Sequence, residues 1–262
     1  MTFLGAVGGG DIALVDEVLK DLAEYPKLST APEAALAAEL TRIAMMQVLR
    51  APYPEPKWLV EFDLSVIPDD WRFSAALLAL NRMIWRGETD RAAVLAEVMT
   101  GFSMKGAPAG SYPEVALKLA RARIAHDKSR INTTQHLARE AAKAAKISGV
   151  IYPFLGKALG PKSPLELAFT EEAPDLLEKL KVMNAGFFRN LVKLHNHCTG
   201  ESVVETLSPR EFYLASALKH GVRYKEIAER MGIAYCRVNV LATRLYETLD
   251  IHKREELDKL VW

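Results

Sequence analysis

Apolar residues recur every three or four positions through most of the first 200 residues, which is the spacing of amphipathic helices. Over residues 11–25, for example, Leu14, Val18 and Leu22 fall on one helical face. The alternation of apolar and polar residues that marks strands is scarce. The pattern predicts helices over residues 11–25, 34–49, 70–84, 89–100, 111–125, 133–146, 164–169, 173–181 and 185–195. We therefore expect an all-α protein.

Short polar or glycine-containing turns join several of these helices in pairs. Gly87 lies in the turn between 70–84 and 89–100, and the polar segment HDKSRIN joins the next pair. Antiparallel helices that repeat in this way predict a helical-hairpin stack, in which each pair buries the apolar face of its neighbour. The proline-bearing segment APYPEPKW interrupts the series.

The C-terminal part predicts four helices with tight connections. Ser208 suits a helix cap, Pro209 the first helical turn, and Gly221 the end of that helix. Gly232 ends the second predicted helix, just before the third begins. The predicted ranges are 209–220, 224–231, 235–249 and 254–262. Two helices joined by a tight glycine-containing turn are the helix-turn-helix pattern.

At this point the sequence resembles a known family. The positions that carry the resemblance are Leu207, Pro209, Arg210, Glu211, Leu214, Leu218, Gly221, the run KEIAERMGI over 225–233, Val238, Arg244, Leu245, Tyr246, Leu249, Glu256 and Leu257. Together they resemble the DNA-binding domain of LuxR/GerE-type transcriptional regulators. The resemblance implies a four-helix, LuxR-type helix-turn-helix domain over residues 207–262.

The segments LLALNRMIWRGETDRAAVLAEVM and AREAAKAAKISGVIYPFLG resemble the degenerate tetratricopeptide-like repeats that precede this domain in MalT-like regulators. The resemblance implies a helical-repeat sensor or interaction domain over residues 11–198. The residues from Cys198 to Ser202 are then the expected hinge.

The third helix of a helix-turn-helix enters the major groove of DNA. By the resemblance, the residues that face bases are Asn239, Val240 and Thr243. Asn pairs with adenine, and Val packs on a thymine methyl group. The candidates for contacts with the DNA backbone are Arg223, Lys225, Arg237 and Arg244. The family usually has a basic residue at position 239, so we expect weak non-specific affinity.

The last predicted helix has an apolar strip made of Leu257, Leu260, Val261 and Trp262. In the family this helix commonly dimerises, which makes these four residues dimerisation candidates. Packing of the strip on its own domain, or on the N-terminal one, is the alternative.

Composition changes this picture little. The chain of 262 residues is 50% hydrophobic and 26% charged with a net charge of +1, as in a soluble protein without a global attraction to nucleic acid or membrane. Two cysteines imply no disulfide framework. The start, MTFLGAVGGG, does not resemble a signal peptide, and no apolar run approaches the ~20 residues of a membrane span. We expect a cytoplasmic protein.

Two segments resemble functional sites only partly. GKALGPKS, over 156–163, comes near a phosphate-binding loop, but Pro161 replaces the glycine required before the lysine. His195, His197 and Cys198 are three neighbouring metal-ligand types without an obvious fourth. We expect neither a metal nor a cofactor, and no set of residues predicts catalysis.

The sequence thus predicts a DNA-binding transcriptional regulator, not an enzyme. It binds double-stranded DNA as a homodimer, and its helical repeats bind an effector, either a small molecule or a protein. The alternative is a protein-interaction module with a vestigial helix-turn-helix, which acts through a partner signalling protein. The third helix separates the two, because exposed Arg237, Asn239 and Arg244 favour DNA.

Overall fold

The computed structural model describes residues 7–31, 33–103, 109–156, 163–200, 207, 209–249 and 251–259. Throughout these ranges the regular secondary structure is helical, so the predicted all-α class is confirmed. None of the described helices has the length and apolarity needed to cross a bilayer. The chain forms two compact units, Met1–Pro54 with Asn184–Trp262, and Glu55–Met183. The predicted division into 11–198 and 207–262 stays a prediction.

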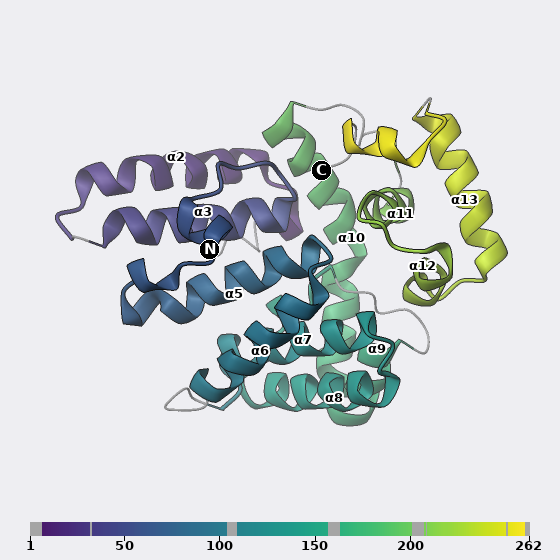
Figure 1. Ribbon diagram of the computed structural model, residues 1–262, viewed down its shortest axis with the longest axis horizontal. Helices are drawn as coiled ribbons and strands as arrows, with labels where there is room; N and C mark the ends of the chain where they lie inside the picture. The colour runs from purple at the N-terminus through teal and green to yellow at the C-terminus, as the bar shows by residue number, and fades with distance from the viewer. Residues whose placement is uncertain are drawn as a thin grey trace. The chain divides into compact units, whose positions relative to one another are not determined.

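The first unit begins with two helices, α2 (Ile12–Leu28) and α3 (Ala34–Leu49), which pack side by side (Figure 1). The carboxylate of Asp11 caps α2 by accepting a hydrogen bond from the backbone N–H of Leu14 at 3.0 Å. Such a cap satisfies one of the unpaired amides at a helix start. On α3, Ile43 is buried completely. The local cap of α2 and the apolar face of α3 are enough to explain why these helices form and pack together.

The long helix α10 (Pro174–Thr199) differs from the prediction. Two helices were expected, over 173–181 and 185–195, and the break between them is wrong. The three intervening residues, Val182, Met183 and Asn184, include neither proline nor glycine, so nothing in them stops a helix. Leu180 and Leu194, one on each half of α10, are both completely buried. Burial of this kind outweighs the weak local signal for a break.

The first unit also contains the C-terminal helices. These are α11 (Pro209–Lys219), α12 (Tyr224–Met231), α13 (Tyr235–Thr248) and the 3-10 helix η4 (Arg254–Lys259). The predicted ranges match α12 and α13 closely, whereas Ser208 and part of the predicted hinge lie outside the described residues. Leu214, Leu218, Ile227 and Leu245 form part of one shared core. The four elements therefore fold around a common apolar centre.

Polar contacts join the end of α3 to α11 and to α10 within this unit. Arg50, which follows α3 in the left-handed conformation (φ 56°, ψ 28°), donates through Nη1 to Ser216 Oγ at 2.9 Å. Its guanidinium carbon lies 5.2 Å from the centroid of the Phe212 ring. On α10, His195 Nδ1 lies 3.0 Å from the carbonyl oxygen of Leu49. The C-terminal helices are thus packed on the N-terminal pair through specific polar groups.

The second unit is a succession of helices in chain order. Its elements are α4 (Lys57–Glu61), η1 (Leu64–Val66), α5 (Asp69–Trp85), α6 (Thr89–Ser103), α7 (Tyr112–Asp127), α8 (Ile131–Ser148), η2 (Tyr152–Phe154), α9 (Pro164–Glu172) and residues 174–183 of α10. From α5 to α9 each helix packs on the next, and α5 also contacts α7. The helix α4 begins at the end of the proline-bearing segment APYPEPKW, and Pro56 directly precedes it, a position that proline tolerates.

A salt bridge network holds α5 to the segment that precedes α4. Arg82 donates through Nε and Nη2 to the two oxygens of Glu55, both at 2.8 Å, and Arg86 Nη2 lies 3.0 Å from Glu55 Oε2. The hydrogen bond from Arg82 lowers the pKa of the Glu55 carboxyl below its ordinary value. Arg82 is itself buried, with 8% of its surface exposed, so this pair is part of the interior of the unit.

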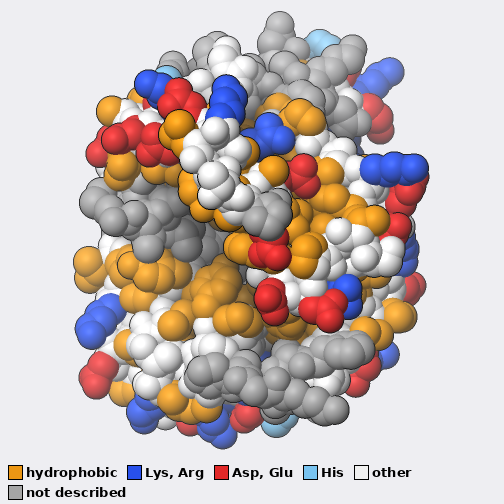
Figure 2. Space-filling model, turned by 90° about the vertical axis from the view of Figure 1, so that its left-hand side faces the viewer, with side chains coloured by type: hydrophobic (Ala, Val, Ile, Leu, Met, Phe, Trp, Pro, Cys, Tyr) orange, Lys and Arg blue, Asp and Glu red, His pale blue; other side chains and the backbone are white. Residues whose placement is uncertain are grey.

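The outer surface mixes charges of both signs. On the face drawn in Figure 2, Lys and Arg side chains are interspersed with Asp and Glu, and hydrophobic side chains also reach the surface. This distribution agrees with the net charge of +1 over the whole chain. Any attraction to a polyanion has to come from a local group of cations.

Candidate nucleic-acid interface

The turn between α12 and α13 is short and well determined by its residues. Gly232 ends α12 with a φ of 64°, a left-handed conformation that glycine adopts without steric cost. The backbone N–H of Ile233 then donates to the carbonyl of Ala228 at 3.0 Å. Only residues 232–234 separate the two helices, as the sequence predicts. The start of α13 is therefore fixed against α12.

One face of α13 is anchored in the core. Val238 and Leu245 are completely buried and Ala242 is 2% exposed. Since these positions recur at helical spacing, the opposite face of α13 points outward. On that face Cys236 and Glu247 are exposed. The outward face is thus determined by burial and not by the resemblance alone.

The three predicted base-reading residues lie on the outer part of α13. Val240 is exposed over 54% of its surface, Thr243 is exposed, and Asn239 is half-buried. The Thr243 hydroxyl donates to the backbone carbonyl oxygen of Asn239 at 3.1 Å. The structure therefore brings the three together on adjacent turns, although Asn239 lies towards one side of the exposed face.

The four predicted backbone-contacting cations, Arg223, Lys225, Arg237 and Arg244, are all exposed. Arg223 and Lys225 lie at the start of α12, and the two others on α13. Among the described residues, Arg223, Lys225 and Arg237 form no ion pair. Two other arginines are used inside the unit. Arg230 is paired with Glu226, and Arg254 donates to the carbonyl of Leu218. Arg223, Lys225 and Arg237 are thus distinct from the cations that hold the fold.

The predicted dimerisation strip is only partly described. Leu257 is completely buried in the core formed with α11 to α13, so it is not part of an exposed strip in the single chain. It lies on η4, a 3-10 helix, whereas the sequence suggested a longer helix to residue 262. Leu260, Val261 and Trp262 lie outside the described residues. A role of this segment in dimerisation stays a prediction.

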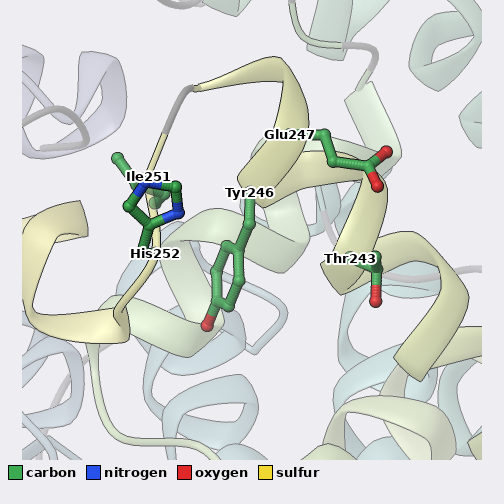
Figure 3. A pocket seen from close by; sticks show the side chains of 5 residues that line it. All are labelled: Thr243, Tyr246, Glu247, Ile251 and His252. Atoms are coloured by element: carbon green, nitrogen blue, oxygen red, sulfur yellow. The ribbon is translucent and has the colours of Figure 1, made fainter.

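A shallow hollow lies beside the C-terminal end of α13 and was not predicted. Its lining residues are Thr243, Tyr246, Glu247, Ile251 and His252, and its volume is about 480 Å³ (Figure 3). Burial, together with a hydrogen bond to Tyr224, raises the pKa of Tyr246 to about 12. The hollow forms because the chain after α13 folds back along it, which no local sequence pattern indicates.

The histidine segment of α10 has structural contacts instead of a ligand-like arrangement. His195 contacts Leu49 as described, and His197 Nε2 lies 2.8 Å from an oxygen of Asp16. Across the described ranges, no three or more His, Cys, Asp or Glu side chains are grouped so that they could hold a metal ion. Cys198 is half-buried, and this burial, with the Asp16 charge, raises the pKa of its thiol. Residues 157–162 of the phosphate-loop-like segment lie outside the described residues.

Comparison with protein-family models, with curated proteins and with solved structures gives no significant match in any of the three.

Proposed function

We propose that this protein is a DNA-binding transcriptional regulator in which α12 and α13 form a LuxR-type helix-turn-helix. In this proposal α13 enters the major groove, and the side chains of Asn239, Val240 and Thr243 meet base edges. The chain acts as a homodimer on double-stranded DNA in the cytoplasm. Two free cysteines, Cys198 and Cys236, support a reducing compartment.

The observation that carries this proposal is the outer face of α13. Its inward face is fully used in packing, whereas its outward face presents Val240, Thr243 and two exposed arginines, Arg237 and Arg244. A helix with one buried face and one exposed face that combines cations with small side chains fits the dimensions of a major groove. The tight turn at Gly232 keeps α12 close to the start of α13, as in a helix-turn-helix.

The cations at the start of α12 support contacts between this helix and the phosphate groups of DNA. Arg223 and Lys225 are exposed and make no ion pair within the described residues, so their charge is available to phosphate groups. Phosphate contacts position a helix in the groove, and base contacts specify the sequence. We assign positioning to Arg223, Lys225, Arg237 and Arg244.

The second unit is proposed to be a tetratricopeptide-like stack that binds an effector, either a small molecule or a protein. Helices α5 to α9 pack in chain order and α5 also contacts α7, an arrangement that supports repeated helical hairpins. Such stacks present extended surfaces to partners.

A second candidate is a protein-interaction module with a vestigial helix-turn-helix, which acts through a signalling partner. Two exposed apolar or aromatic side chains on α13, Tyr235 at 53% and Val240 at 54%, favour it. Aromatic side chains are enriched at protein interfaces, and a charged groove is not needed there.

The test is selection of binding sites from a pool of random-sequence DNA duplexes, followed by salt titration of the enriched duplex. We expect a motif to emerge over several rounds. Arg237→Ala should weaken binding to all duplexes and lower the salt slope by about 1, whereas Asn239→Ala should relax the base preference at one position.

The matched control is Lys57→Ala, which removes one positive charge from a side chain 84% exposed in the second unit. It should leave both the affinity and the salt slope unchanged. Equal, weak binding of every duplex at low salt, with no enrichment, would overturn the regulator proposal and support the interaction module.

A further inference from the structure

The outward face of α13 has an ordered arrangement of side-chain types. With 3.6 residues per turn, the line opposite Val238 consists of Cys236, Val240, Thr243 and Glu247, and Val240 and Thr243 are its two middle residues. Arg237 and Arg244 lie together on one side of this line, and Asn239 lies on the other. The cations therefore line one side of the exposed face, and branched side chains occupy the middle of its length.

Val240 has no role inside the unit that explains its position. It is exposed over 54% of its surface, although α13 has a complete buried stripe without it. A β-branched residue also has lower helix propensity than most alternatives, so helix formation does not favour it. A single exposed valine is common on protein surfaces. Val240 is distinguished from a single exposed valine by Thr243, which lies beside it on the next turn of the helix.

The side chain of Thr243, three residues after Val240, has a methyl group beside its hydroxyl. The hydroxyl donates to the carbonyl of Asn239 at 3.1 Å, so its one donor is used along the helix. Thr243 is exposed, so its γ-methyl group is available for an outside contact. Val240 and Thr243 thus present methyl groups on adjacent turns, at the centre of the face (Figure 3 shows Thr243).

We propose that this pair reads thymine through its 5-methyl group, so that the protein selects sites with thymine under the centre of α13. The proposal rests on the proposed function. In the major groove, thymine is the one standard base that presents a methyl group, and apolar side chains contact it. The amide of Asn239 at the side of the pair can bind adenine through N6 and N7. The recognised steps are therefore A·T pairs, with the methyl groups as the discriminating feature.

The experiment replaces thymine by uracil, which removes only the 5-methyl group. The highest-affinity duplex from the random pool is synthesised with single thymine-to-uracil changes at each position. We expect about fourfold weaker binding for each contacted methyl, the loss that corresponds to about one buried methylene-sized group. Cytosine-to-5-methylcytosine changes elsewhere in the duplex should leave affinity unchanged.

Three variants assign the effect to the two residues. Val240→Ala and Thr243→Ser should each bring the thymine-to-uracil affinity ratio close to one at a single position. Thr243→Val keeps a methyl group and loses the hydroxyl, so it should keep the ratio. Because both positions are exposed, none of the three variants should melt below the parent protein, and Val240→Ala should melt slightly higher because alanine favours the helix, which circular dichroism checks.

The outcomes separate this proposal from the proposed function. A selected motif that binds equally well with thymine or uracil keeps the regulator and overturns methyl reading. The same holds if the ratio survives in both Val240→Ala and Thr243→Ser. Absence of any selected motif overturns the proposed function and therefore also overturns methyl reading.

Discussion

Arg50 donates a hydrogen bond to Ser216, and the two residues are 166 positions apart in the chain. Arg50 lies just after α3, whereas Ser216 is 5% exposed in the middle of α11. The same guanidinium stacks over Phe212, a ring that is 1% exposed. A charged group in a mostly buried setting makes stronger hydrogen bonds than one in water. The contact therefore stabilises the packing of the C-terminal helices on the N-terminal pair.

We expect Arg50→Met to lower the free energy of unfolding by about 2 kcal/mol, because it keeps an unbranched apolar stem and removes all donors. Ser216→Ala should cost about 1 kcal/mol. In urea denaturation, the double variant should lose about 1 kcal/mol less than the sum of the two single losses. Strictly additive losses would contradict a direct bond between the two side chains.

The stability of the second unit should depend on the charge of Glu55. Its pKa is lowered from 4.5, first by the hydrogen bond from Arg82, so folding favours the ionised form. This contribution is fully present above about pH 4.5 and is lost as the pH falls through the lower folded-state pKa. We expect Glu55→Gln to cost about 2 kcal/mol at neutral pH, and the cost to shrink at about pH 3.

The measurement is urea denaturation of the parent and the variant at both pH values. Glu61→Gln is the matched control, because its partner Lys57 is 3.8 Å away and both side chains are exposed. A surface pair of this kind should contribute less than about 0.5 kcal/mol at either pH. A cost for Glu55→Gln that does not change with pH would show that packing, and not charge, is responsible.

Ser129→Gly should stabilise the protein. Ser129 is an exposed residue in the turn between α7 and α8 and has a φ of 56°, a left-handed conformation that disfavours residues with a Cβ. Glycine relieves this strain, and we expect a gain of about 1 kcal/mol together with a higher melting temperature.

Gly149, at the end of α8, gives the opposite substitution. It has a φ of 71°, and an added Cβ would meet no atom within 4 Å, so strain in the backbone is the only expected effect of Gly149→Ala. That variant should lose about 1 kcal/mol in the same thermal melts. If both variants changed stability in the same direction, left-handed strain would not be the cause.

The two cysteines should differ in their reaction with a thiol reagent. Cys236 is exposed on the first turn of α13, whereas Cys198 is half-buried and its pKa is raised, chiefly by burial. Because the thiolate is the reactive form, we expect Cys236 to react about tenfold faster, or more, at about pH 8. Cys236→Ser should remove the fast phase only. Adding the selected duplex should slow that phase if α13 lies in the groove.

Local patterns were sufficient to predict most helices of this protein. The range 34–49 coincides with α3, because its apolar face and helix-forming residues are all local signals. In the same way Gly232 located the turn before α13, since a left-handed helix end has few alternatives to glycine. The outward position of Val240 and Thr243 followed from the buried stripe, whose spacing the sequence contains.

Features that depend on distant residues could not be predicted. The continuity of α10 depends on residues buried in both halves, such as Leu180 and Leu194, and the sequence around residues 182–184 has no sign of it. The burial of Leu257 depends on a core supplied by α11 to α13. Nothing near Arg50 in the sequence indicates Ser216 as its partner. Hydrophobic spacing reports which face is buried, but not which element covers it.

The contacts within the first unit span almost the whole length of the chain, and this affects how the protein folds during synthesis. Asn190 and Lys193 bind the carbonyls of Gly8 and Gly10, 182 and 183 positions away. The N-terminal pair of helices thus leaves the ribosome on the order of ten seconds before its partners do. During that time Glu55–Met183, which contains its own core, can fold first. Until α10 and α11 arrive, Leu49 and Arg50 lack the partners that they have in the folded unit, so the newly made chain exposes an incomplete surface of the kind that aggregates or binds chaperones.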